Sequence, residues 1–151
     1  MAGFCIKLFM YKRILVTLDH SAADDAILHH IESLNPFIKS EVVLLHVADG
    51  WAARYHDELQ LKDSEEVRQD RAYLEAVAKR LQKKGIKTTH FLAMGDPADE
   101  IIKFAKEHQC DLIAMSTHGH RFLSDLIHGA TATKVRHQVD IPVLLLKAPK
   151  V

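Results

Sequence analysis

The chain alternates short apolar runs with longer segments in which apolar residues recur every three or four positions. The runs contain many valines, leucines and isoleucines, which is typical of strands that are buried on both faces of a sheet. In the longer segments the spacing places the apolar residues on one side of a helix. The pattern therefore predicts strands that alternate with helices along the chain. Five strands are expected, over residues 12–18, 41–47, 86–93, 112–115 and 141–146.

Local signals indicate where the first three helices begin and end. Ser21 is expected to cap a first helix over residues 22–34, which Asn35-Pro36 then ends. A second, longer helix is expected over residues 67–81. Asp96-Pro97 supplies the cap and the first-turn proline of a third helix. Each helix lies between two of the expected strands.

This order predicts an α/β protein, a three-layer sandwich in which a five-stranded parallel sheet is covered by helices on both faces. Such sheets bind ligands beyond the carboxyl ends of their strands, where the strand order reverses. The segments that supply those ends are 17–19, 47–49 and 116–119. A ligand site is therefore expected where these three segments meet.

The stretch from Asp111 to Leu146 places two glycines, Gly119 and Gly129, around this expected site. An apolar run leads into a polar loop, and Gly129 is expected to open a fourth helix made of small residues. Glycine allows a ligand to approach the backbone closely, and the N–H groups that open a helix favour phosphate. The stretch therefore predicts an anion site formed mainly by main-chain groups.

Composition limits the classes of protein to which the chain can belong. Its 151 residues, 48% hydrophobic and 26% charged, fit one domain with a core. We assign that domain to residues 11–151 and treat residues 1–10 as an apolar N-terminal extension, too short to span a bilayer. Lys+Arg and Asp+Glu both number 20, so neither nucleic acid nor a membrane is an expected partner. Cys5 and Cys110 lack paired spacing, which favours a reducing, cytoplasmic location.

The candidate residues also have structural interpretations. Gly129 could simply form a tight turn, and Asp19 could be a turn or cap residue. His118 and His120 could form a metal-binding pair, but no cysteine or carboxylate falls at ligand spacing, and we expect no metal site. The chain contains neither GxxxxGK[ST] nor GxSxG, and Lys134 lies too far into its helix to replace a phosphate-loop lysine. We therefore expect no catalytic residues.

Four segments, ILVTLDHS, VVLLHV, GDPADEII and DLIAMSTHG, follow one another in this order along the chain. In these segments and their order, from about Tyr11 to Lys147, the chain resembles the universal stress protein family. They match the family's first strand with its aspartate, its second strand and the segments before its glycine loop.

The nucleotide-binding subgroup of this family carries a glycine, two residues, a second glycine, nine residues, a third glycine and then serine or threonine. In this chain those four places are occupied by Ser116, Gly119, Gly129 and Ala130. The chain therefore departs from the family pattern at Ser116, where the pattern has glycine, and at Ala130, where it has serine or threonine. Ser116 can still donate its backbone N–H. Ala130 lacks a hydroxyl whose hydrogen bond would contribute about 0.5–1.5 kcal/mol, and Thr131 could replace it. The departures therefore predict weaker binding rather than none.

The resemblance implies a Rossmann-like fold of the adenine nucleotide alpha hydrolase type and a regulatory role in the stress response. It implies that ATP or AMP binds, with or without Mg²⁺, and that hydrolysis is at most slow. Asp19 would reach the ribose or a metal, and the Val47 backbone would pair with adenine. A homodimer through residues 141–146 is also implied, and the alternative is a nucleotide-free dimeric interaction module. The residues assigned to the nucleotide site are Thr17, Leu18, Asp19, Val47, Met115, Ser116, Thr117, His118, Gly119, Gly129, Ala130 and Thr131.

Overall fold

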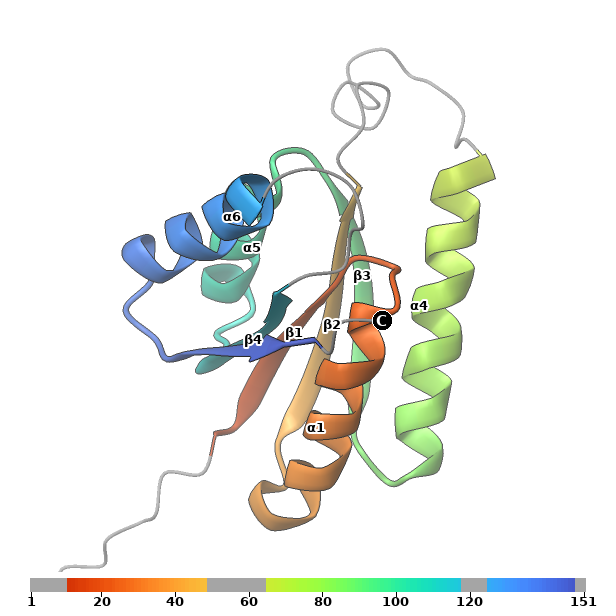
Figure 1. The fold of residues 1–151 in the computed structure, drawn as a ribbon. Helices are drawn as coiled ribbons and strands as arrows, with labels where there is room; N and C mark the ends of the chain where they lie inside the picture. The colour runs from red at the N-terminus through yellow and green to blue at the C-terminus, as the bar shows by residue number, and fades with distance from the viewer. Residues whose placement is uncertain (1–10, 49–64, 118–124, 149–151) are drawn as a thin grey trace, which may run out of the picture.

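Five strands and four helices alternate along the part of the chain that the structure, a computed structural model, describes (Figure 1). That part comprises residues 11–48, 65–117 and 125–148. Within it, no helix is both long and apolar enough to cross a bilayer. In chain order the elements are β1 (Arg13–Leu18), α1 (Ala23–Ile38), β2 (Glu41–Ala48), α4 (Glu65–Lys83), β3 (Thr88–Met94), α5 (Pro97–Glu107), β4 (Leu112–Thr117), α6 (Asp125–Gln138) and β5 (Val143–Lys147).

The strands form one parallel sheet in the order β3-β2-β1-β4-β5, which confirms the predicted fold class. The chain moves outward from β1 to β3 and then returns to the other side of β1 with β4. In register, Leu18 lies opposite His46 on β2, and Val16 lies opposite Ala114 on β4. The strand order reverses between β1 and β4, and this is the switch point at which open α/β sheets bind ligands.

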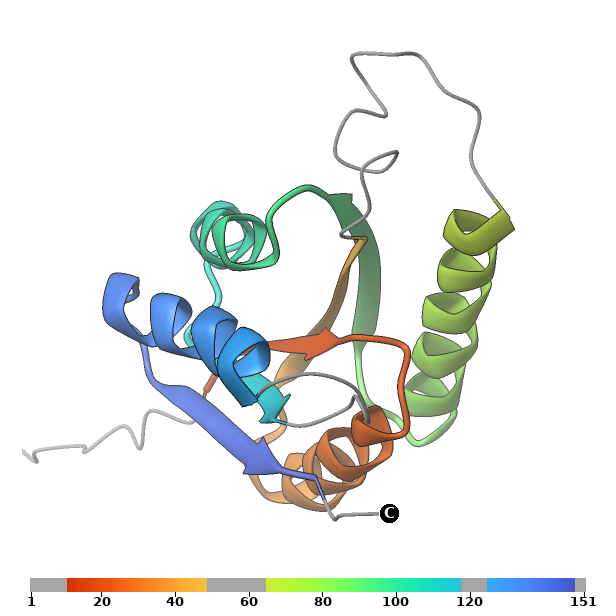
Figure 2. The ribbon, with the colours of Figure 1, turned by 45° about the horizontal axis from the view of Figure 1, so that its top comes forward.

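Helices cover both faces of the sheet (Figure 2). Alternate side chains of each strand point to opposite faces, so Ile14 and Val16 enter one apolar core and Leu15 enters the other. Helices α1 and α4 pack on the first core, and α5 and α6 pack on the second. Because both faces are covered by helices, polar groups are concentrated at the ends of the strands.

The end of α1 differs from the sequence prediction. Pro36 lies inside the helix, which continues to Ile38 instead of ending before the proline. A proline removes one backbone donor, and this loss is small in a last turn that other hydrogen bonds hold. The Lys39 N–H donates to the Asn35 carbonyl at 2.7 Å, and the Asn35 amide donates to the Ser40 carbonyl at 2.8 Å. These two bonds stabilise the end of the helix.

Two boundaries in the C-terminal third also differ. Helix α6 begins at Asp125, so Gly129 lies inside the helix instead of opening it. A helix interior tolerates a glycine at a cost of about 1 kcal/mol, and a lone glycine is therefore a weak boundary signal. Strand β5 begins at Val143 because Pro142 has no N–H to donate to the ladder, although its carbonyl accepts from Ile113.

Capping hydrogen bonds fix the ends of α4 and α5. Asp96 caps α5 as predicted, because its side chain accepts from the Asp99 N–H at 3.1 Å. After α4, the Gly85 N–H donates to the Gln82 carbonyl at 2.9 Å. The Ile86 N–H donates to the Leu81 carbonyl at 3.1 Å. Gly85 has a φ of 78°, a left-handed conformation that glycine adopts without strain.

Gly85→Ala is expected to destabilise the protein by about 1 kcal/mol, because a Cβ disfavours the left-handed backbone. An added Cβ would meet no atom within 4 Å, so this cost comes from the backbone alone. Urea denaturation measures it. An unchanged free energy of unfolding would contradict the assigned helix end.

Candidate functional site

Three strand ends form one edge of the sheet around the switch point. Asp19 directly follows β1, Val47 is the second-to-last residue of β2, and Ser116 and Thr117 are the last two residues of β4. Strand β2 extends two residues past the last β1–β2 pair, which joins Leu18 to His46. The structure therefore brings the predicted Asp19, Val47, Ser116 and Thr117 to the same edge, as the parallel register requires.

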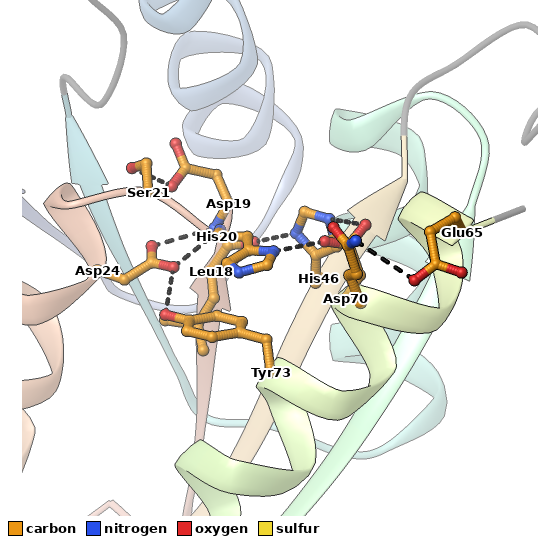
Figure 3. A network of polar contacts seen from close by, with 10 residues as sticks. Leu18, Asp19, His20, Ser21, Asp24, His46, Glu65, Asp70 and Tyr73 are labelled. Carbon is orange, nitrogen blue, oxygen red and sulfur yellow. Dashed lines mark hydrogen bonds and ion pairs between the residues drawn. The ribbon is translucent and has the colours of Figure 1, made fainter.

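The loop after β1 is folded around the carboxylate of Asp24, which is 1% exposed (Figure 3). One carboxylate oxygen accepts from the Asp19 N–H at 3.0 Å. The other accepts from the His20 N–H at 2.9 Å and from the Tyr73 hydroxyl of α4 at 2.7 Å. Asp24 lies in the first turn of α1, and its carboxylate holds the loop instead of simply facing the helix dipole.

Burial is the largest influence on the pKa values of Asp24 and Tyr73. It raises the pKa of the Asp24 carboxyl from 3.8 to about 6, against the lowering effect of the Asp19 N–H and the Tyr73 hydroxyl. Burial and the Asp24 hydrogen bond together raise the pKa of the Tyr73 phenol, so Tyr73 remains a hydrogen-bond donor at neutral pH.

Asp19 and Ser21 complete the loop. The Ser21 hydroxyl donates to the Asp19 carboxylate at 2.5 Å and accepts from the Ala23 N–H at 3.2 Å. Ala22 occupies the N-cap position that was predicted for Ser21, so the serine acts one residue earlier. The Asp19 carboxylate thus has a hydrogen-bond partner within its own loop, and its predicted contact with a ligand stays a prediction.

Ser116 occupies the first glycine place of the family pattern and uses its side chain within the protein. Its hydroxyl donates to the Ala23 carbonyl in the first turn of α1 at 3.1 Å. This bond joins the end of β4 to the start of α1 across the switch point. The Thr117 carbonyl accepts from Ala148, which joins the same strand end to the residue after β5.

Leu18 and Met115 can contribute only backbone atoms, because their side chains are buried in the two cores. The Leu18 carbonyl already accepts from the His46 ring at 2.7 Å. Thr17 and Val47 are half-buried, and Val47 packs against the core beneath α5 and α6.

Gly129, Ala130 and Thr131 lie in the second turn of α6, where Gly129 and Ala130 are exposed. A Cβ built on Gly129 meets nothing within 4 Å, and its backbone is helical. The described residues therefore supply no folding reason for a glycine at this position, and the tight-turn interpretation of Gly129 is wrong. The predicted His118 and Gly119 lie outside the described residues.

Sequence reasoning missed a cluster formed by His20, His46 and Asp70 (Figure 3). Asp70 of α4 contacts His20 Nδ1 at 2.7 Å and His46 Nε2 at 3.2 Å. Two signals could have identified it. His46 is the one polar residue in the apolar run 42–47, and Asp70 falls on the apolar stripe of α4 between Val67 and Leu74.

The described residues contain no group of three histidine, cysteine, aspartate or glutamate side chains arranged to hold a metal ion. The pair considered from the sequence, His118 and His120, lies outside them. Lys134 of α6 pairs with Asp99 at 2.6 Å and with Asp96 at 3.5 Å, and thus joins α6 to the start of α5.

Comparison with known proteins agrees with this geometry. The model of the Universal stress protein family matches residues 10–147. The chain belongs to the universal stress protein family. The family resemblance expected from the sequence is thereby confirmed over all five strands and four helices.

The chain is similar to the universal stress protein MJ0577 of Methanocaldococcus jannaschii, with 29% identity over 91% of this chain and 96% of that protein. A solved structure of MJ0577 matches with a TM-score of 0.78 over 94% of this chain and 99% of that one, at 28% identity. Two other universal stress proteins share the fold. One was solved in complex with cAMP and matches with a TM-score of 0.64 at 15% identity, over 91% of this chain and 97% of that one. The other, from Archaeoglobus fulgidus, was solved in complex with dAMP and matches with a TM-score of 0.67 at 18% identity, over 91% of this chain and 99% of that one.

Tyr73→Phe is expected to destabilise the protein more at neutral than at acid pH. The folded-state pKa of Asp24, about 6, lies above 3.8, so protonated Asp24 favours the folded state below about pH 4, and this contribution is lost as pH rises through 6. Once Asp24 is ionised, its bond from Tyr73 is charge-assisted. The variant should lose about 1.5–3 kcal/mol near pH 7.5 and about 0.5–1.5 kcal/mol near pH 4.5. Urea denaturation at both pH values measures this, and equal losses would contradict it.

Proposed function

We propose that this universal stress protein binds an adenine nucleotide, ATP or AMP, at the carboxyl edge of β1, β2 and β4, and acts as a regulatory protein of the stress response. Occupancy of the site, not rapid turnover, would be the signal, because the sequence lacks the phosphate loop that couples lysine and magnesium to phosphoryl transfer. The observation that best supports this function is the position of Asp19 and Ser116, which lie at the ends of the neighbouring strands β1 and β4, one on each side of the switch point.

The positions of the groups suit the parts of a nucleotide. Val47 extends past the end of β1, which leaves a strand edge for the hydrogen-bonding edge of a base. Asp19 offers a carboxylate suited to a ribose hydroxyl or a bound Mg²⁺. At Gly129 the exposed backbone of α6 carries no side chain that would obstruct a phosphate. The complexes of two relatives with cAMP and dAMP support the choice of an adenine nucleotide.

Ser116 and Ala130 support the alternative function, a nucleotide-free interaction module. The Ser116 hydroxyl is bonded to the Ala23 carbonyl, so this side chain is part of the fold. Ala130 cannot donate the hydrogen bond that a serine or threonine would provide. We place nucleotide binding first because the Ser116 side chain points to α1, so it does not prevent the backbone from donating to a ligand.

Gly129→Ala is expected to separate folding from binding. The new methyl group meets no protein atom, and alanine favours a helix interior over glycine by up to about 1 kcal/mol, so the free energy of unfolding should rise slightly. The same methyl group would stand between the backbone and a phosphate. Calorimetric titration with ATP, AMP and cAMP should show binding to the wild type that is roughly tenfold weaker in the variant, a loss of about 1.4 kcal/mol.

Gly85→Ala is the matched control, because Gly85 precedes β3 at the opposite end of the strands. It should lower stability without changing affinity. If the wild type and Gly129→Ala bind nucleotide with equal affinity, the phosphate does not lie beside α6. A wild type that releases no heat with any of the three nucleotides would favour the interaction module.

We also propose that the protein is a homodimer that pairs through β5. Strand β5 is an edge of the sheet, and β4 is its one partner among the described strands. An apolar edge strand associates unless something covers it. Leu144 and Leu146 pack against the core beneath α1, whereas Leu145 is 40% exposed. Leu145 is therefore the position at which a charge tests the interface with least damage to the core.

Leu145→Lys is expected to convert a wild-type dimer into a monomer, because a lysine opposite its copy would place two like charges in an apolar contact. Light scattering at micromolar concentration measures the mass. Phe91→Lys on β3, the opposite edge strand, is the control for a charge at a similarly exposed apolar residue and should leave the dimer intact. A monomeric wild type would refute the interface.

A further inference from the structure

The hydrogen-bond ladder between β1 and β2 stops before β2 does. Its last pair joins Leu18 to His46, and β2 continues beyond that pair. The Glu41 N–H donates to the Lys12 carbonyl at 2.9 Å, so Glu41 faces β1. Alternate residues of a central strand bond to opposite neighbours, and Val47 lies an even number of residues after Glu41. The N–H and carbonyl of Val47 therefore also point to the side of β1.

The donor that would extend this ladder is engaged elsewhere (Figure 3). In the observed register, a β2 carbonyl that faces β1 accepts from the residue after its β1 partner, so the Val47 carbonyl would accept from the His20 N–H. The His20 N–H instead donates to a carboxylate oxygen of Asp24 at 2.9 Å. The Asp19 N–H donates to the other oxygen at 3.0 Å. Asp24 thus accepts from both main-chain N–H groups that follow β1, and the ladder ends there.

His20 has a backbone conformation that a residue with a side chain rarely adopts. Its φ is 58°, in the left-handed region. Three contacts hold this conformation: the bond from its N–H to Asp24, the stacking of its ring on Tyr73 with centroids 4.1 Å apart, and the 2.7 Å contact of Nδ1 with Asp70. The turn away from the ladder is therefore maintained by tertiary contacts against the preference of the backbone.

The Asp24 carboxylate is itself fixed from two sides. From α4, the Tyr73 hydroxyl donates to it at 2.7 Å. From β4, the Ser116 hydroxyl donates to the Ala23 carbonyl at 3.1 Å, which ties the first turn of α1 to the strand end. Because Asp24 is buried between these contacts, its carboxylate cannot follow the loop if the loop moves. It is a fixed acceptor that determines where the chain after β1 lies.

We propose that Asp24 is a positioning residue that keeps the Val47 carbonyl available for the ligand, and that the site thereby selects a base with an exocyclic amino group. This inference rests on the proposed nucleotide site. A carbonyl can only accept, so the ligand atom opposite Val47 must be a donor. Adenine presents an amino group, whereas guanine carries an oxygen at the same place on the ring. A base without the donor leaves a desolvated carbonyl unpaired and binds more weakly.

Asp24→Ala is expected to remove this selectivity. Without the carboxylate, the His20 N–H is released to donate to the Val47 carbonyl and to extend the ladder by one bond. The carbonyl then has a partner within the protein, and an amino group on the base contributes less. Asp25→Ala is the matched control, since Asp25 is the next residue of the same turn and its side chain is 85% exposed.

The test is calorimetric titration with ATP and with purine riboside triphosphate, an ATP analogue that lacks only the exocyclic amino group. At about pH 8 the Asp24 carboxyl, whose pKa is about 6, is ionised. The wild type and Asp25→Ala should bind ATP roughly tenfold more tightly than the analogue, the effect of one hydrogen bond. Asp24→Ala should bind the two within about twofold of each other. A general loss of stability would weaken both ligands and leave this ratio unchanged.

The possible failures are distinguishable. An Asp24→Ala variant that keeps the full preference for ATP would overturn the role of Asp24. A wild type that binds ATP and the analogue equally would overturn the selectivity and leave the nucleotide site in place. A wild type that binds neither would refute the proposed nucleotide site and this inference with it.

A second measurement needs neither ligand nor variant, and it decides the matter if Asp24→Ala fails to fold or to bind. NMR couplings across hydrogen bonds identify the acceptor of a given amide. In the free wild type, the His20 amide nitrogen should couple to the carboxyl carbon of Asp24. A coupling to the Val47 carbonyl carbon, or to neither carbon, would overturn the proposal.

Discussion

The parallel register of β1, β2 and β4 is the constraint on which the rest of the structure depends. Because both faces of these strands are buried under helices, their side chains are almost all apolar, and polar groups can collect only where the strands end. The register brings three such ends to one edge, with Asp19 and Ser116 on either side of the switch point. Site and core therefore follow from the same arrangement of strands.

The fold could be predicted from the sequence because its signals are local and repeated. Apolar runs gave the five strands, and Asp96-Pro97 gave the start of α5 correctly. Boundaries were wrong where one residue was given too much weight, as with Pro36, which α1 includes, and Gly129, which α6 includes. A single proline or glycine indicates which backbone conformation is intrinsically favoured at its position. Packing and neighbouring hydrogen bonds decide where the helix actually begins and ends.

The site was predictable only in part. The positions of Asp19, Val47 and Ser116 follow from strand order, but the bond from the Ser116 hydroxyl to α1 joins residues 93 positions apart, and no spacing rule gives it. The same holds for Asp70, 50 positions from His20. Departures from a family pattern therefore have a structural side: Ser116 contributes a contact between β4 and α1 that a glycine could not make.

The central claim is that a nucleotide binds at the carboxyl edge of β1, β2 and β4. Its most direct test is a residue-resolved map of backbone amide chemical shifts as ATP is added to the isotope-labelled protein. We expect the largest changes at Asp19, Val47, Ser116 and Gly129. Changes centred on Arg13 and Asp111, at the opposite end of the same strands, or no changes at millimolar ATP, would contradict the account.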